Sequence, residues 1–403
     1  MRSGRSFFIV ERRAALLLSF CLGAGLPLMA QSENPATKPY ATLDRQSVTY
    51  RGPVTTGDKS LADGPAVIGM ILPLRGPQEA EGKALLAAAQ IAIEEEQARG
   101  ALPDGRKLAL AVRDESGQWG QASGEILRLI EQDHALAVVT SANGATAHEA
   151  EQIANKISFP ILTLASDSTT TETNVPWLFR LGPSDTDQAR VIAREISEQG
   201  GNGKVLLIAQ ADHDGRVGSE EFAKAARERK LAGIGRVELA ADGSNVRALA
   251  AVQSGAPEAV VVWADASVAK RQLVLIRQEA PGARVYLCSK AAQRGIGEAG
   301  RSGDFSVVVA SREAARPAFA EEYRKRTGAA PGSAAFGAYE AVRLVAAGIR
   351  ARGTSRVLLR EYFAGTEKAR GEEGVLAFDP AGNRIGEFSI VRVSGEAAVV
   401  AGQ

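Results

Sequence analysis

Short apolar segments alternate with longer amphipathic segments over most of this chain. Each apolar segment is bounded by turn residues and has the continuous hydrophobic character of a strand buried on both faces, as strands of parallel sheets are. Seven strands are predicted in this way, over residues 66–72, 107–113, 135–140, 160–165, 204–210, 258–264 and 284–289.

The segments between these strands carry apolar residues at helical spacing. They predict helices over residues 79–98, 118–132, 145–157, 185–199, 218–230 and 267–279. Regular alternation of strand and helix predicts right-handed βαβ units and parallel sheets. Because four predicted strands precede Pro183 and three follow it, we expect an α/β protein with two doubly wound sheets.

The last ninety residues have a different pattern. Helices are predicted over 315–327, 334–352 and 355–364, followed by a hairpin over 374–393 whose turn lies at 379–383. Turn-forming residues concentrate in that turn, which is the basis for predicting a hairpin there.

The N-terminus has the pattern of an export signal. Basic residues precede an apolar run over 14–22, and small residues end at Ala30, so residues 1–30 are predicted to be a signal peptide cleaved before Gln31. Lipid attachment at Cys21 is disfavoured because Phe20 stands where a small residue is preferred. Residues 31–65 are polar and predict a flexible leader. We therefore expect a periplasmic protein.

Composition narrows the function classes. The chain has 403 residues, 45% hydrophobic and 24% charged, with a formal net charge of +1, which excludes a disordered chain and argues against nucleic-acid binding. Without the signal peptide only Cys288 remains, so no intrachain disulfide forms and no cysteine zinc site is expected.

Enzyme motifs are absent from the sequence. There is no HExxH, CxxC, GxSxG or GxxxxGK[ST]. The turn that directly follows the first predicted strand, where a dinucleotide-binding fold would carry GxGxxG, lacks that motif. We therefore expect no catalytic residues, no cofactor and no metal. An assembled hydrolytic site using His213, Asp214 and a distant serine stays open, although nothing favours it over a solvated loop.

Four predicted strand ends are rich in glycine and small hydroxyl residues. In open α/β sheets ligands bind outside the carboxyl ends of the strands. Backbone N–H groups at a helix start, together with hydroxyl groups, suit a carboxylate. The alternative is that these residues only cap helices and form turns. The four segments are 73–82, 140–150, 165–173 and 211–221.

The order and spacing of several motifs resemble those of the type I periplasmic solute-binding proteins of ABC importers, in the branch that includes the leucine/isoleucine/valine-binding proteins. The resemblance extends over about residues 66–393. The motifs that carry it are IGMILPLRG (68–76), LAVRDESG (110–117), NKISFPILTLASDS (155–168), FRLGPSD (179–185), the helical tail 319–349 and GVLAFDPAGNR (374–384).

This resemblance implies two lobes joined by a three-stranded hinge and closing on one small molecule, in a monomer that delivers it to an ABC permease of the inner membrane. Hinge crossings are expected near 181–185, 308–314 and 366–373. The first lobe would comprise 66–183 with 312–368, and the second 184–311 with 369–403.

The resemblance places ligand-carboxylate contacts on the first lobe. The hydroxyl expected after the third strand falls on or beside Thr146, with Ala145 adjacent. Further backbone and hydroxyl contacts fall on Ala165, Ser166 and Ser168.

The second lobe departs from the family pattern. Arg216 and Val217 precede Gly218 where an aromatic residue is usual, and Trp263 is the sole aromatic residue of the next strand-end loop. Lys290 stands near the position expected for the acidic residue that receives a ligand ammonium.

The change at Lys290 leaves two ligand classes open. A buried ammonium beside Lys290 requires another carboxylate, which Asp265, Asp214 or Asp167 would supply. A ligand without an amine would instead use Arg216 and Lys290 as an anion site, unless these charges are a solvated rim. We expect an importer component that binds an amino acid or another small carboxylate or amide; the alternative is a ligand-sensing or regulatory envelope protein of the same fold.

Overall fold

The structure is a computed structural model. It describes residues 64–118, 120–200, 204–231, 233–240, 246–292, 304–310, 316–365, 370–371, 374–386, 388–394 and 397–400. The predicted signal peptide lies outside the described residues, as does the predicted leader apart from residues 64–65.

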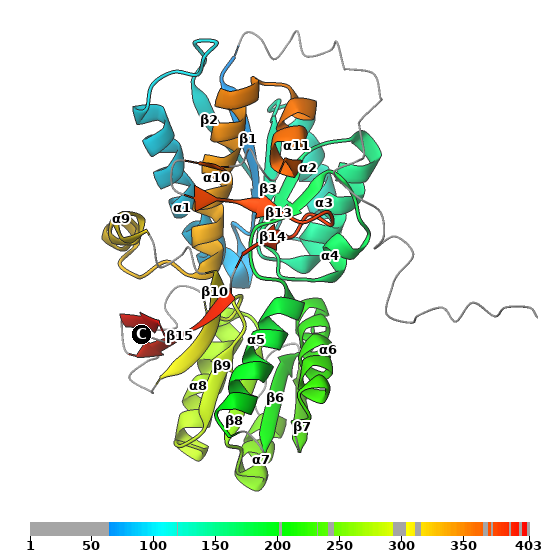
Figure 1. Cartoon of the computed structure of the whole chain (residues 1–403), viewed down its shortest axis with the longest axis vertical. Helices are drawn as coiled ribbons and strands as arrows, with labels where there is room; N and C mark the ends of the chain where they lie inside the picture. Colours follow the sequence, from blue (N-terminus) through cyan, green and yellow to red (C-terminus); the bar gives the residue numbers. More distant parts are fainter. Residues whose placement is uncertain are drawn as a thin grey trace, which may run out of the picture. The chain divides into compact units, whose positions relative to one another are not determined.

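The first half of the chain forms a five-stranded parallel sheet in the order β2-β1-β3-β4-β5 (Figure 1). Its strands are β1 (Ala66–Leu72), β2 (Leu108–Asp114), β3 (Ala137–Thr140), β4 (Ile161–Thr163) and β5 (Leu178–Arg180). The connecting segments are η4 (Gly76–Gln78), α1 (Glu79–Ala98), α2 (Gln121–Glu131), α3 (Gly144–Ile157) and α4 (Thr169–Glu172).

A second sheet has the order β16-β15-β10-β9-β8-β6-β7. Strands β6 to β10 pair in parallel, whereas β15 pairs antiparallel with both β10 and β16. The strands are β6 (Val205–Gln210), β7 (Ile234–Leu239), β8 (Ala259–Trp263), β9 (Arg284–Leu287), β10 (Phe305–Ala310), β15 (Phe388–Ser394) and β16 (Ala397–Val400). The helices are α5 (Asp185–Glu198), α6 (His213–Glu228), α7 (Val246–Gly255) and α8 (Ala266–Glu279).

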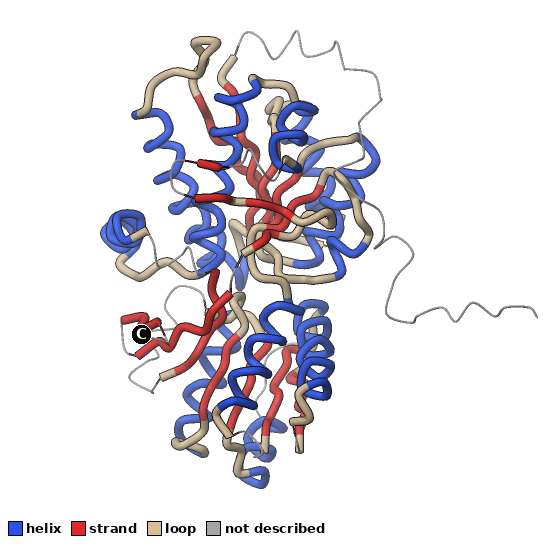
Figure 2. The backbone as a smooth tube through the Cα atoms, viewed as in Figure 1, coloured by secondary structure: helices blue, strands red, loops and turns tan. Residues whose placement is uncertain are grey.

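The C-terminal helices return to the first sheet. They are α9 (Pro317–Thr327), α10 (Ser333–Arg352) and α11 (Arg356–Ala364). Helix α10 packs along α1, where alanines on both helices allow a close approach. Figure 2 shows helices on both sides of the first sheet, matching the two buried clusters that pack on its faces. A separate cluster forms the core of the second lobe.

All seven predicted strands form, and the α/β architecture with two largely parallel sheets is as expected. Four strands of the two large sheets escaped prediction. Strand β5 has only three residues, and the edge strand β7 alternates buried and exposed positions instead of forming an apolar run. The other two are β10, although it contains the apolar run VVVA, and the C-terminal edge strand β16. Helix α6 begins five residues before the predicted start because Asp212 caps it by accepting a hydrogen bond from Gly215 N–H.

The C-terminal segment differs from the sequence prediction. The expected hairpin over 374–393 is divided: β13 (Ala377–Phe378) pairs with β14 (Arg384–Ile385), and β15 belongs to the second sheet. Two more short strands, β11 (Arg370–Gly371) and β12 (Gly374–Val375), pair with each other just before β13.

This division corrects one lobe boundary. Leu376 and Phe378 pack in the first core and Arg384 pairs with Glu340 of α10, whereas Ile390 lies in the second core. The last crossing therefore lies between β14 and β15, and not near 366–373, because the side chains before it are buried with the first sheet. The other lobe boundaries stay predictions, and residues 311–315 of the second expected crossing lie outside the described residues.

Candidate functional site

The loops at the carboxyl ends of the parallel strands are where the two lobes contact each other. Gly144 N–H, at the start of α3, lies 3.2 and 3.3 Å from the two carboxylate oxygens of Asp214 on α6. Gln78 Nε2 lies 3.4 Å from Asp265 Oδ2. His213 Nε2 lies 2.6 Å from Asp167 Oδ2. Loops separated by 46 to 187 residues thus meet at one place, as expected for open α/β sheets.

Arg180 organises the loop after β4. Its side chain is fully buried on β5, and its guanidinium donates to the backbone carbonyl of Asp167 at 2.6 Å and to the hydroxyls of Thr170 and Thr171 at 3.1 and 2.6 Å. Asn383, from the C-terminal segment, accepts from Arg180 Nε at 3.1 Å. A planar group with five donors is suited to this task, so Arg180 holds the loop that presents Ser166, Asp167 and Ser168.

The start of α3 faces a second buried carboxyl group. Asn143 caps the helix by accepting from Ala145 N–H at 2.9 Å. Glu115, at the end of β2, accepts from Ser141 Oγ at 2.7 Å and also from the hydroxyl of Thr146. Burial raises the pKa of Glu115 to about 8, although both hydroxyls act to lower it. The Thr146 hydroxyl predicted to bind ligand is therefore engaged by a carboxyl group that is largely protonated at neutral pH.

Lys290 lies at the centre of an acidic cluster on the second lobe. Its side chain is 7% exposed, and its ammonium pairs with the Asp214 carboxylate and, at 3.0 Å, with Asp265 Oδ1. Burial alone would lower the pKa of Lys290, but these two carboxylates, with Glu81 and Asp212, raise it well above its usual value. Lys290 is therefore a charged lysine held by at least two carboxylates.

The surrounding acids are affected by the same burial. Burial raises the pKa of Glu81 to about 7, and it raises the pKa of Asp212. Burial would also raise the pKa of Asp265, but Lys290 and hydrogen bonds from Gln210 and Gln78 hold it below its ordinary value. Among the described residues, the cluster around Lys290 therefore contains more acidic side chains than basic ones.

Little free space remains around this cluster. One small cavity is lined by Asp214, Asp265, Lys290 and Trp263, and another by Ser166, Ser289 and Lys290. Each has about 10 Å³ of free space, enough for one water molecule. Ligand pockets are usually about 300 Å³ or larger. In this arrangement the side chains of the protein itself fill the space between the loops.

A cavity of about 600 Å³ lies elsewhere, on the second lobe. Glu195, Arg277, Tyr286 and Arg392 are among its lining residues. It is open to solvent at the opposite ends of β9 and β10 from Lys290, and it is remote from the loops that join the lobes.

The predicted site residues separate into three groups. Asp214, Asp265 and Lys290 come together as described. Ser166 accepts from Asp185 N–H through its carbonyl at 2.7 Å, and Ser168 Oγ lies 2.8 Å from Thr186 Oγ1, so both contact the start of α5, where the first crossing between lobes is predicted. The others are Ala145 and Thr146 at the α3 cap, Ala165, whose N–H donates to Thr163 Oγ1, and Arg216, which is exposed. No contact described for Arg216 joins its guanidinium to the Lys290 cluster.

Trp263 is buried rather than presented to a ligand. Its indole N–H lies 3.2 Å from Asp185 Oδ1. Any Cβ at Gly218 would lie 1.9 Å from Trp263 Nε1, so only glycine allows α6 to approach the indole. Burial raises the pKa of Asp185 to about 7.

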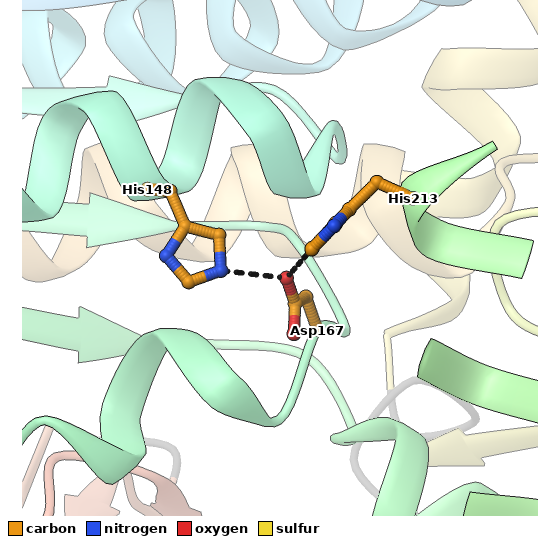
Figure 3. Close-up of side chains that lie close together, drawn as sticks. All are labelled: His148, Asp167 and His213. Carbon is orange, nitrogen blue, oxygen red and sulfur yellow. Dashed lines mark hydrogen bonds and ion pairs between the residues drawn. The ribbon is translucent and has the colours of Figure 1, made fainter. Parts of the chain in front are cut away.

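Two histidines and an aspartate form a second cluster between the lobes (Figure 3). His148 Nε2 on α3 and His213 Nε2 on α6 lie 3.0 and 2.6 Å from the same oxygen, Asp167 Oδ2. Hydrogen bonds to Asp167 and Glu151 raise the pKa of His148 to about 9. Burial would raise the pKa of Asp167, but hydrogen bonds from His148, Thr169 and His213 hold it well below its ordinary value.

Comparison with known proteins establishes the class. The family model of periplasmic binding proteins matches residues 65–360, so the chain belongs to the periplasmic binding protein family. This confirms the resemblance found in the sequence. None of the helices in the described ranges has the length and apolar character needed to cross a membrane. No curated protein matches the chain.

Solved structures share its fold. A solute-binding protein of an R. palustris ABC transporter, in complex with benzoate, is 20% identical with a TM-score of 0.73, covering 84% of this chain and 96% of the other. LivJ of Streptococcus pneumoniae, a branched-chain amino acid transporter substrate-binding protein in complex with isoleucine, is 21% identical with a TM-score of 0.69, covering 84% and 99%. The leucine-binding protein LivK of Thermotoga maritima is 19% identical with a TM-score of 0.70, covering 84% and 98%.

Proposed function

We propose that this protein is the exported, non-catalytic substrate-binding component of an ABC importer, and that it captures a small zwitterionic solute of the amino-acid class between its lobes. The observation that carries the proposal is the cluster of Asp214, Lys290 and Asp265, which lies against the start of α3. Membership of the periplasmic binding protein family supports the binding role.

The charge of the cluster favours a ligand with a positive group. Lys290 is matched by Asp214 and Asp265, and Asp212 and Glu81 add further acidic groups. An anion site built from Arg216 and Lys290 is less well supported, because Arg216 is exposed and Lys290 is already neutralised. A ligand ammonium would pair with Asp265 once Lys290 turns aside on its flexible stem.

The start of α3 suits the carboxylate of the same ligand. Gly144 N–H already lies within hydrogen-bonding distance of a carboxylate, that of Asp214. A ligand carboxylate would replace Asp214 there and would be favoured by the helix N-terminus. The Thr146 hydroxyl lies two residues further along the helix. The ligand would thus contact both lobes, and it would stabilise the arrangement in which they close around it.

The proposed setting follows from the sequence and the family. The N-terminal signal would export the chain to the periplasm, where a monomer would deliver solute to an inner-membrane permease. Among the similar structures, one holds isoleucine and another holds benzoate, a carboxylate without an amine. The test must therefore separate these two ligand classes.

A thermal-unfolding screen tests the proposal. Amino acids, mono- and dicarboxylates, aromatic acids, amides and sugars are added to the purified protein. A ligand at one hundred times its Kd adds about 2.7 kcal/mol to the free energy of unfolding, which raises Tm by several degrees. We expect stabilisation by an amino acid, and its loss in Asp265→Asn. The exposed Asp104→Asn is the matched control and keeps the shift.

Two outcomes contradict the proposal in different ways. Stabilisation by a carboxylate without an amine, unaffected by Asp265→Asn, overturns the zwitterion class while keeping the binding role. Absence of any stabilising solute overturns solute capture, and favours a sensor that recognises a protein partner.

A further inference from the structure

We propose that His148, Asp167 and His213 form a binding site for a divalent transition-metal ion, with Zn²⁺ as its natural test ion, and that the bound ion links the two lobes. The three donor atoms lie within 4.8 Å of one another. This site adjoins the proposed solute site, because Asp167 and Asp214 both approach Gly144 at the start of α3, but it uses none of the residues Asp214, Asp265 and Lys290 and does not depend on that proposal.

The donor atoms already converge. Both Nε2 atoms point toward Asp167 Oδ2, as Figure 3 shows, at 3.0 Å from His148 and 2.6 Å from His213. Zinc binds imidazole nitrogen and carboxylate oxygen at about 2.0–2.2 Å, so tetrahedral ligand atoms lie roughly 3.3 Å apart. The two distances to Asp167 Oδ2 would therefore lengthen by less than ~1 Å to admit the ion, while the two Nε2 atoms, which lie within 4.8 Å of each other, would settle at the tetrahedral spacing. Two imidazoles and one carboxylate favour zinc and similar metals over calcium or magnesium.

Neighbouring groups orient the donors in the manner of metal sites. Asp167 Oδ1 accepts from Thr169 N–H at 2.9 Å and from Thr169 Oγ1 at 2.7 Å, which leaves Oδ2 directed at the histidines. On the far side of the His148 ring, Nδ1 lies 3.7 Å from the Glu151 carboxylate. A carboxylate behind a ligating histidine fixes its tautomer and strengthens it as a ligand.

The protonation of His148 also fits replacement of a proton by a metal. Its Nδ1 faces Glu151 and its Nε2 faces both Asp167 Oδ2 and, at 2.9 Å, Thr169 Oγ1. Without metal, an Nε2 proton would be donated to Asp167 or to Thr169. A divalent ion would displace the Nε2 proton and leave Nδ1–H directed at Glu151. The two positive charges of the ion would then be balanced by Asp167 and Glu151.

The site is accessible and connects separate parts of the chain. The side chains of His148 and His213 are 23% and 42% exposed, so an ion can enter and a water molecule can complete the coordination. His148 and Asp167 belong to the first lobe, whereas His213 begins α6 of the second. A bound ion would therefore favour the arrangement in which these lobes meet.

Titration calorimetry with Zn²⁺ on protein without a histidine tag tests the site. We expect one ion per chain at micromolar Kd or tighter. His148→Ala and His213→Ala should each weaken binding more than tenfold, and Glu151→Gln should weaken it less. His134→Asn is the matched control, because His134 is exposed, makes no contact with the cluster, and has a positive φ of 55° that asparagine tolerates.

Cobalt substitution provides an independent measurement. Co²⁺ should give a visible absorption band of low-symmetry coordination that disappears in His213→Ala while the circular dichroism of the fold is retained. Saturable zinc binding that survives both histidine substitutions, or no saturable binding at pH 7–8, would show that the cluster is only a hydrogen-bonded ion group. Neither result bears on the amino-acid screen, so the two proposals fail separately.

Discussion

Each side of the site buries a cation, but Arg180 and Lys290 are satisfied in different ways. Arg180 is surrounded by backbone carbonyls and hydroxyls of the loop after β4, which are neutral groups. Lys290 is surrounded by carboxylates from separate loops. A guanidinium with many fixed acceptors is a structural element, whereas an ammonium on a flexible stem, paired with carboxylates from other loops, can be exchanged for another ammonium. We therefore expect the face of the first lobe that borders the site, the first wall, to be rigid, and the face of the second lobe around Lys290, the second wall, to be adjustable.

The largest effect is expected at Arg180. In Arg180→Met the carbonyl of Asp167 and the hydroxyls of Thr170 and Thr171 lose their donor inside the protein, and each buried unsatisfied group is costly. We expect the free energy of unfolding to fall by about 4 kcal/mol, measured by denaturant unfolding. Arg190→Met is the control, because Arg190 is 64% exposed. A loss no larger than that of the control would show that Arg180 does not hold the wall together.

Lys290→Met should have the next largest effect. Removing one partner of a buried ion pair leaves uncompensated charge and costs about 3 kcal/mol at pH 7. The pH dependence distinguishes this from lost packing. In the wild type, Lys290 helps hold the pKa of Asp265 below its ordinary value, so that pairing stabilises the fold above the unfolded pKa and is lost as pH falls.

In Lys290→Met the pH dependence of the stability contributed by Asp265 reverses. Burial still acts to raise the pKa of Asp265, and without the lysine the folded protein favours the protonated acid. The variant should therefore recover stability relative to wild type between pH 7 and pH 4, as measured by thermal unfolding. Lys83→Met, on an exposed part of α1, is the control. A deficit that is constant with pH would mean that Lys290 contributes packing and not charge.

Glu115→Gln tests the buried acid of the first lobe. Because burial raises its pKa to about 8, Glu115 contributes stability below its unfolded pKa, and this contribution is lost as pH rises through 8. An amide cannot ionise, so the variant should exceed the wild type by about 1–2 kcal/mol at pH 9 and differ little at pH 5. Glu79→Gln, exposed at the start of α1, should show no such dependence. Equal stabilities of Glu115→Gln and wild type at pH 9 would refute the assignment.

Sequence patterns predicted the fold better than the site. Apolar runs identified seven strands, six of which are buried along most of their length, because burial on both faces leaves a local signature; the seventh, the edge strand β2, is only partly buried. They did not reveal where the C-terminal segment returns to the first core, since this depends on contacts such as Phe378 on Phe179 across the chain. The strand-end rule drew attention to the segment that contains Asp214, and the family resemblance drew attention to Asp265 and Lys290; the structure brings the three side chains together.

The other parts of the site had weaker signals. Arg180 lies in a short strand where a lone arginine suggests an exposed end. His148 and His213 are 65 positions apart, without the short spacing that marks a metal motif. Only the meeting of α3 and α6 brings them to one aspartate, so the expectation of no metal rested on local spacing alone.

The smallest effect on stability is expected at Gly144, where the two walls meet. A Cβ there would lie 2.2 Å from Asp214 Oδ1, so Gly144→Ala must displace that carboxylate from the start of α3. If the second wall is adjustable, Asp214 moves aside and the free energy of unfolding changes by only about 0.5 kcal/mol. The same methyl group narrows the proposed carboxylate position, so the thermal shift given by a stabilising amino acid should shrink. Gly124→Ala, whose Cβ meets nothing within 4 Å in α2, should keep the full shift. A loss of more than ~2 kcal/mol in Gly144→Ala would mean that the contact with Asp214 is a fixed part of the fold, and the contrast between the two walls would then fail.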